Sequence, residues 1–310
     1  MYKLSQLIKR NLLLFFRDKR KVIMTFFSPL ITLFIFILFA KSLYTQNISK
    51  EMTSVQSQIG NGSLLVGLLG ISLLTNAISI SILIVNDSEK NVFNDLSMTP
   101  IRTSTIRISY LIVNVILNIA LTTMIYLVLL AYLAISKNLS EQIITIEDKQ
   151  IVIPALLTIK TGFSIFGMIV LGALLNSTFF VFVFSFVKNT TVFSVLSGAL
   201  SSTSGFFIGA FIPITILPLF LKNLASALPA TQVVQVIKYL TFLNLAEHLQ
   251  VVSQQVESLK PLLASVNFLQ NIYFVGYENF QIGYSILYVA ICFAVVFIVS
   301  SVVRFRVTKK

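Results

Sequence analysis

The sequence contains no tryptophan, one cysteine, one histidine and few charged residues. Only 11% of its 310 residues are charged, whereas about a quarter are charged in soluble domains. Cys292 is the single cysteine, which excludes a disulfide framework or a thiolate metal site within one chain. His248 has no ligand cluster at metal-binding spacing around it, and we expect it at the surface. The sequence therefore predicts no metal site.

Motifs for nucleotide binding and hydrolysis are also missing. The chain has no G-x-x-x-x-G-K-[ST] phosphate loop, no G-x-S-x-G nucleophile elbow, no H-E-x-x-H and no C-x-x-C pair. We therefore predict no catalytic residue and no cofactor bound by the chain itself. Any energy must come from elsewhere, and a partner protein is the simplest source.

Long apolar runs dominate what is present. The chain is 56% hydrophobic with a mean hydropathy of +0.91. A helix needs about 20 apolar residues to cross a bilayer. Six runs meet this length without Asp, Glu, Lys or Arg, and they are residues 22–40, 64–85, 108–135, 161–187, 190–212 and 282–303. The predicted fold is an all-α membrane protein, a single transmembrane domain over 1–310 with six transmembrane helices.

The basic residues indicate how these helices are oriented. The formal net charge is +12, but most Lys and Arg lie beside the apolar runs, which is typical of topology determinants and not of nucleic-acid binding. With a cytoplasmic N-terminus, fifteen of the 23 Lys and Arg fall inside. Both termini are therefore predicted to be cytoplasmic.

Two cytoplasmic segments are candidate contact surfaces. Residues 2–20 have apolar side chains at helical spacing and basic ones on the other side, which predicts an amphipathic interfacial helix. It could dock a partner or only anchor the chain to lipid. The loop 86–107 could be a contact surface or a solvated connector; its charged residues and proline are Asp87, Glu89, Lys90, Asp95 and Pro100.

Small and polar residues distinguish two of the spans. The fifth carries a stripe that predicts close approach of a helix from this chain or a second copy: Ser194, Ser197, Ser201, Gly205 and Gly209. On the third span Asn114 and Asn118 form a polar stripe, and Asn76 lies on the second. These asparagines are candidates either for interhelical hydrogen bonds or for lining a transport pathway.

The region 213–281 is predicted to be extracellular. Pro213 should end the fifth span, and the segment 217–228 is too short to cross. A re-entrant helical hairpin between the fifth and sixth spans fits this pattern. Non-helical backbone at membrane depth is tolerated only where protein or a cavity supports it. For residues 231–281 we expect an outer cap of short helices.

This organisation resembles the membrane subunits of bacterial type 2 ABC exporters, nearest to the drug and hemolysin branch. Four features carry the resemblance: the basic amphipathic start ending in Phe15-Phe16-Arg17-Asp18, the segment from Asp87-Ser-Glu-Lys90 to Leu96-Ser-Met-Thr-Pro100, the small-residue fifth span, and the element from Phe211-Ile-Pro213 to Leu217-Pro218 followed by Leu228-Pro229-Ala230.

The resemblance implies partners and roles. Two cytoplasmic ATPase subunits, which bind ATP and Mg, would dock on the interfacial helix and the loop 86–107, while a second permease, a copy or a paralogue, would pack through the second and fifth spans. The implied coupling residues are Phe16, Arg17, Asp18, Asp87, Glu89, Lys90, Asp95 and Pro100. The implied outer gate consists of Phe211, Pro213, Leu217 and Pro218.

The expected function is that of a permease subunit in the cell membrane, exporting an amphipathic or lipidic substrate such as a drug, toxin, lipid or glycolipid. A separate ATPase would drive it. The alternative is a non-transporting membrane scaffold or sensor, because apolar spans and interfacial helices serve that role equally well.

Overall fold

The computed structural model describes residues 2–19, seven positions between 22 and 38, and residues 53–99, 101–146, 149–210, 214–254 and 260–302. Twelve of the 19 positions of the predicted first span, 22–40, fall outside these residues. So do three predicted site residues: Pro100, Phe211 and Pro213.

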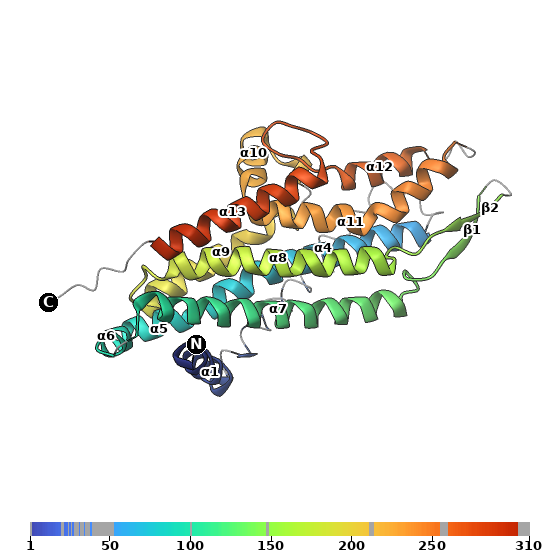
Figure 1. The fold of residues 1–310 in the computed structure, drawn as a ribbon. Helices are drawn as coiled ribbons and strands as arrows, with labels where there is room; N and C mark the ends of the chain where they lie inside the picture. The colour runs from blue at the N-terminus through green and yellow to red at the C-terminus, as the bar shows by residue number, and fades with distance from the viewer. Residues whose placement is uncertain are drawn as a thin grey trace.

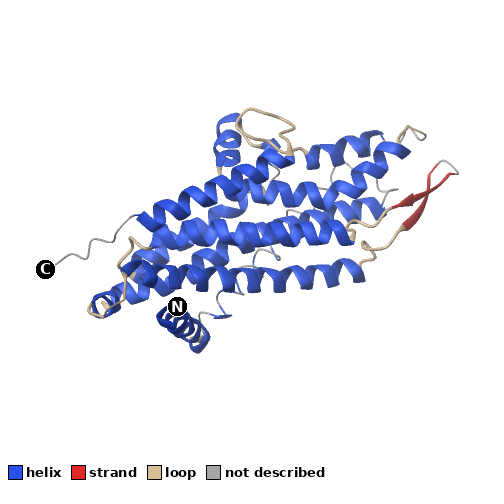
Figure 2. Ribbon diagram, viewed as in Figure 1, coloured by secondary structure: helices blue, strands red, loops and turns tan. Residues whose placement is uncertain are grey.

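Helices make up nearly all of the described chain (Figure 2). In chain order the elements are α1 (Tyr2–Arg17), α4 (Thr53–Ile80), α5 (Ile82–Glu89), α6 (Val92–Ser97), α7 (Thr103–Ile135), β1 (Gln142–Ile146), β2 (Lys149–Ile153), α8 (Ile159–Phe184), α9 (Thr190–Phe207), the 3-10 turn η3 (Ile214–Ile216), α10 (Leu219–Ala227), α11 (Pro229–Val252), α12 (Lys260–Gln270) and α13 (Ile282–Val302). The strands form an antiparallel hairpin in which Gln142 pairs with Ile153. Apart from this hairpin, the described chain fits an all-α membrane protein.

Four helical segments of the described chain are long and apolar enough to cross a membrane. They are Val55–Glu89, Thr103–Ile135, Ile159–Phe184 and Ile282–Ser300. These segments contain or closely match the predicted second, third, fourth and sixth spans. Helix α9, in the predicted fifth span, is not among them, so the number six remains a prediction.

The first two of these segments are longer than a bilayer requires. The 35 residues of Val55–Glu89 extend over about 52 Å, compared with a hydrocarbon thickness of about 30 Å. In Figure 1, α5 and α6 lie at one end of the bundle and the β-hairpin at the other. Helices α9 and α13 run beside the half near α5 and α6, and α11 and α12 beside the half near the hairpin. We call these the α5–α6 end and the hairpin end.

Helix α11 corrects the expectation of short helices in 231–281. It is a single helix of 24 residues that packs against α4, α8, α12 and α13. Pro229 stands in its first turn, where the missing N–H costs nothing. Gln232 and Thr241 are fully buried in this packing although both are polar. In the sequence, polar residues of this kind resemble those of a solvated segment, although here they lie on a helix buried between other helices.

Glycine permits the close packing of α4 and α8 against α11. A Cβ added at Gly70 of α4 would lie 2.5 Å from a methyl carbon of Val234, and one added at Gly172 of α8 would lie 2.9 Å from a methyl carbon of Val233. Neither distance is tolerated, so any larger residue would push the helices apart. These two glycines fix how closely α11 sits in the bundle.

Candidate functional site

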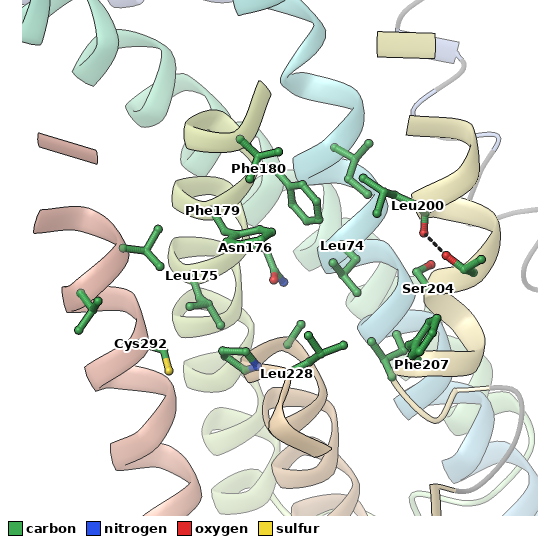
Figure 3. Close-up of a pocket in the computed structure, with 18 of the residues that line it drawn as sticks. Leu74, Leu175, Asn176, Phe179, Phe180, Leu200, Ser204, Phe207, Leu228 and Cys292 are labelled. Carbon is green, nitrogen blue, oxygen red and sulfur yellow. Dashed lines mark hydrogen bonds between the residues drawn. The ribbon is translucent and has the colours of Figure 1, made fainter. Parts of the chain in front are cut away.

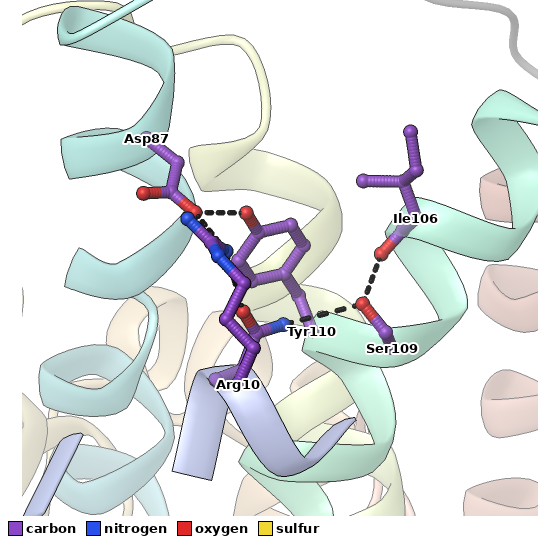
Figure 4. Close-up of polar contacts among 6 residues, drawn as sticks. Arg10, Asp87, Ile106, Ser109 and Tyr110 are labelled. Carbon is purple, nitrogen blue, oxygen red and sulfur yellow. Dashed lines mark hydrogen bonds and ion pairs between the residues drawn. The ribbon is translucent and has the colours of Figure 1, made fainter. Parts of the chain in front are cut away.

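A buried charged cluster joins α1 to the α5–α6 end of the bundle. Arg10 of α1 donates a hydrogen bond to the Asp87 carboxylate of α5, with 2.7 Å between Nη1 and Oδ2. The hydroxyl of Tyr110 on α7 donates to the same oxygen. Beside them, Asn11 donates to Ser109 at 3.2 Å (Figure 4). Helix α1 is thereby held to α5 and α7 through contacts that span 77 and 98 positions of the sequence.

Burial makes this cluster depend on its pairing. The Asp87 side chain is 9% exposed and that of Arg10 is 34% exposed. A buried carboxylate without a cation would be strongly unfavourable. Burial by itself would lower the pKa of Arg10, but the hydrogen bond and the negative charge of Asp87 raise it above its ordinary value. Arg10 therefore stays charged and holds α1 in place.

The packing of α1 bears on the two interpretations of the N-terminal helix. Leu7 and Phe15 are buried and α1 packs against α7 and α5, so the helix contacts the bundle as well as presenting an apolar surface. Leu13 and Phe16, in contrast, are exposed. One face of α1 packs against the bundle, and the other face is exposed.

The structure separates the predicted coupling residues into two groups. Asp87 is buried within the chain, so it is not an open contact point, and Asp18 is partly buried. Pro100 is outside the described residues. The exposed members are Phe16, Arg17, Glu89, Lys90 and Asp95. These exposed residues remain predicted ATPase contacts.

Glu89 makes a contact that the sequence did not indicate. Its Oε1 accepts hydrogen bonds from the backbone N–H of Thr190, at 3.2 Å, and from the Thr190 hydroxyl, at 3.1 Å. Thr190 begins α9, and a carboxylate is favourable at a helix N-terminus. The contact links α5 to α9 across 101 positions of sequence. Only the fold brings the two residues together.

The predicted asparagines lie in helix–helix contacts. Asn76, Asn114 and Asn118 are each almost fully buried between α4 and α7. Their side-chain amides donate to Thr122, to Ala77 and Ser81, and to Leu73 and Ser177, respectively. This geometry fits the interhelical alternative, while a role in lining a pathway stays a prediction.

The small-residue stripe of α9 is only partly covered. Gly205 is buried, in the part of α9 that packs on α4, whereas Ser194 is exposed and Ser197 and Ser201 are half-buried. Gly209 lies beyond the helix and has a φ of 74°. The Ala210 N–H bonds to the Gly205 carbonyl, which makes Gly209 the left-handed residue that ends α9. The expectation that the fifth span extends as helix to residue 212 is therefore wrong.

The region of the predicted gate is described only in part. Leu217 is half-buried against a small cluster containing Ile214, Ala225 and Tyr273. Pro218 is exposed and precedes α10 as its N-cap residue. Phe211 and Pro213 fall outside the described residues, so the gate stays a prediction.

A second polar cluster fastens the loop 271–281 to α10 and α11. Lys222 of α10 pairs with Glu278 at 3.1 Å, and its Nζ lies 3.8 Å from the centre of the Tyr273 ring. Gln235 of α11 accepts from the Tyr273 N–H at 2.6 Å and donates to its carbonyl at 3.1 Å. Gln232 donates to that carbonyl as well. No sequence pattern indicated this cluster, because its members are up to 56 positions apart.

His248 is half-buried on α11, which corrects the expectation of a surface residue. Within the part of the chain that the structure describes, no group of three or more His, Cys, Asp or Glu side chains lies close enough to hold a metal ion. The two clusters can position helices relative to one another, and neither offers a nucleophile paired with a base.

Comparison with known families agrees with this arrangement. The model of the family described as ABC-2 type transporter matches residues 2–242, from α1 into α11. No curated protein sequence matches the chain. Because the match covers well over half of the sequence, the chain belongs to the ABC-2 type transporter family, as an integral membrane permease component of an ABC transporter whose family works with an ATPase partner and usually forms dimers.

Proposed function

We propose that the chain is the permease subunit of an ATP-driven exporter that moves an amphipathic or lipidic molecule out across the bacterial cytoplasmic membrane. Support comes from the connections at the α5–α6 end, where Asp87 joins α5 to α1 and α7, and Glu89 joins α5 to α9. A force applied to α5 and α6 would therefore reach three further helices.

The proposed transporter includes two kinds of partner subunit. Two cytoplasmic ATPase subunits, which would bind ATP and Mg, dock at the α5–α6 end, and a second permease, identical or paralogous, completes the transporter. The exposed residues Phe16, Arg17, Lys90 and Asp95 are available for ATPase contacts. Asp87 acts indirectly, by positioning α1 against α5. Both termini are cytoplasmic in this arrangement.

Charge reversal on the exposed surface tests the proposal. The double variant Lys90→Glu and Asp95→Lys keeps the net charge but inverts its local pattern, so it should weaken association with the co-expressed ATPase severalfold. The matched control exchanges two exposed charges at the hairpin end in the same way, as Lys137→Glu with Glu141→Lys. Co-purification measures the association, and substrate-stimulated ATP hydrolysis in proteoliposomes measures coupling.

Two results would contradict the proposal. Unchanged ATPase association in the double variant would remove the α5–α6 end from docking. An assembled complex whose ATP hydrolysis responds to no amphipathic substrate and moves none would instead favour the scaffold or sensor alternative.

A further inference from the structure

An apolar pocket of about 540 Å³ lies between α4, α8, α9, α13 and the first turn of α11. Its walls include Leu74, Leu175, Phe179 and Phe207, which Figure 3 labels. Val295 also lines it. The volume lies within the range of about 300 to 1,000 Å³ that is typical of small-molecule sites. It is several times the roughly 150 Å³ that admits a benzene molecule.

The pocket is placed to exchange its contents with lipid. Its residues on α4, α8 and α13 fall inside three of the candidate membrane spans. Helix α9 packs on α4, and α13 on α8 and α11, with no extensive packing between α9 and α13 among the described residues. Leu200 of α9 and Ile291 of α13, both lining residues, are 40% and 53% exposed. In a membrane-inserted chain these exposed lining residues on α9 and α13 would lie at the level of the hydrocarbon.

One polar side chain in this pocket lacks a partner. Thr203 and Ser204 donate to carbonyls of their own helix, at 2.8 and 2.7 Å. Asn176 of α8 is only 4% exposed, points into the pocket in Figure 3, and has no side-chain hydrogen bond to any described residue. Its amide offers both donors and an acceptor.

The unpaired side chain of Asn176 differs from those of the other buried asparagines. Asn114 and Asn118 each donate to a backbone carbonyl of α4 at 3.0 Å. An amide without a hydrogen bond in an apolar setting costs free energy, so a ligand that supplies the bond is favoured. The ligand group must be neutral, because none of the lining residues carries a charge to balance one.

We propose that this pocket binds a neutral single-chain amphiphile from the bilayer, with its hydrocarbon chain against the apolar walls and one hydroxyl or carbonyl group hydrogen-bonded to Asn176. The inference concerns binding alone, so it goes beyond the proposed function and does not depend on which molecule is exported. Pro229 lines the pocket where α10 turns into α11, so the bound chain touches this turn as well as α9 and α13.

The absence of tryptophan makes a direct test available. Phe179→Trp places one fluorophore at the pocket of the full-length chain in lipid nanodiscs. The probes are brominated hexadecanol and brominated hexadecane, which quench tryptophan on contact and differ in one hydroxyl. We expect saturable quenching by the alcohol at a concentration about fivefold lower than for the alkane, the factor that one net hydrogen bond supplies.

Two matched variants locate the effect. Val195→Trp puts the reporter on the exposed face of α9 away from the pocket, where both probes should quench equally and without saturation. Adding Asn176→Leu to the Phe179→Trp chain should remove the preference for the alcohol while keeping the alkane response. Size-exclusion and helical circular dichroism check that each variant is folded.

A competition experiment needs no change at Asn176. In the Phe179→Trp chain, unbrominated hexadecanol should displace the brominated alcohol more effectively than hexadecane does. Equal, non-saturating quenching by both probes at Phe179→Trp would overturn the proposal, and so would a preference for the alcohol that survives Asn176→Leu.

Discussion

Two clusters of the molecule, one at the α5–α6 end and one beside α10, each combine a carboxylate, a cation and a tyrosine, in opposite arrangements. At the α5–α6 end the carboxylate of Asp87 is buried and the cation of Arg10 is more exposed, 9% against 34%. At the Lys222 cluster the cation is buried and Glu278 is exposed, 11% against 72%. Tyrosine completes each cluster: Tyr110 donates its hydroxyl to Asp87, and the ring of Tyr273 lies under Lys222.

The difference teaches which partner matters in each pair. Removing the exposed member of a pair leaves the buried charge without a partner. Removing the buried member leaves an ion that water can solvate. The Arg10 pair has the more deeply buried carboxylate and a matched hydroxyl donor. The Lys222 pair has a cation that also rests on an aromatic face. We therefore expect the Arg10–Asp87 pair to be more sensitive to removal of a charge than the Lys222–Glu278 pair.

The largest effect is predicted for Arg10→Met. It leaves Asp87 buried with only the Tyr110 hydroxyl, so the free energy of unfolding should fall by about 2 kcal/mol, less than for a fully buried pair because Arg10 is partly solvated. For a chain of this size the midpoint of thermal unfolding should fall by about 3 °C, followed by circular dichroism. Lys9→Met removes an exposed charge from the same helix and should have almost no effect. An equal loss in both variants would show that the pairing is unimportant.

A smaller effect is predicted for Glu278→Gln. Lys222 keeps the Tyr273 ring and some access to water, so the loss should be about 1 kcal/mol, or about 1.5 °C in the unfolding midpoint. Glu247→Gln, an exposed carboxylate on α11, is the matched control. A loss larger than that of Arg10→Met would reverse the ranking of the two clusters.

The smallest effect is predicted for Glu89→Gln. The amide oxygen still accepts from Thr190, but the negative charge at the start of α9 is lost, which costs about 0.5 kcal/mol. Amide hydrogen exchange in the first turn of α9 should therefore rise about twofold, with exchange in α13 unchanged. Unaltered exchange at Thr190 would mean that the charge does not hold α9 to α5.

Apolar length made the membrane spans predictable, because a run such as 108–135 has few alternatives to a spanning helix. Contacts between distant charges were not predictable in the same way. Asp87 in a polar loop looks like a surface residue, and only the fold shows Arg10 and Tyr110 beside it. The sequence could have indicated at most that the charges on 2–20 and 86–107 are complementary.

Helix α11 escaped prediction for a related reason. Lys238, Glu247 and several polar residues break its apolar pattern, and the rules for spans and for amphipathic helices both miss a helix buried among other helices. The end of α9 was placed at Pro213 because proline is the more familiar helix breaker. Gly209 ends the helix earlier, with a backbone conformation that only its φ reveals.

The length of α7 has a mechanical consequence. An unbroken helix of 33 residues is a rod of about 50 Å, and it carries the hairpin at one end and the Tyr110 contact near the other. If such a rod tilts by about 10° around its base, the far end swings by about 9 Å. A modest push near Asp87 would therefore become a large displacement at the β-hairpin without any helix having to unwind.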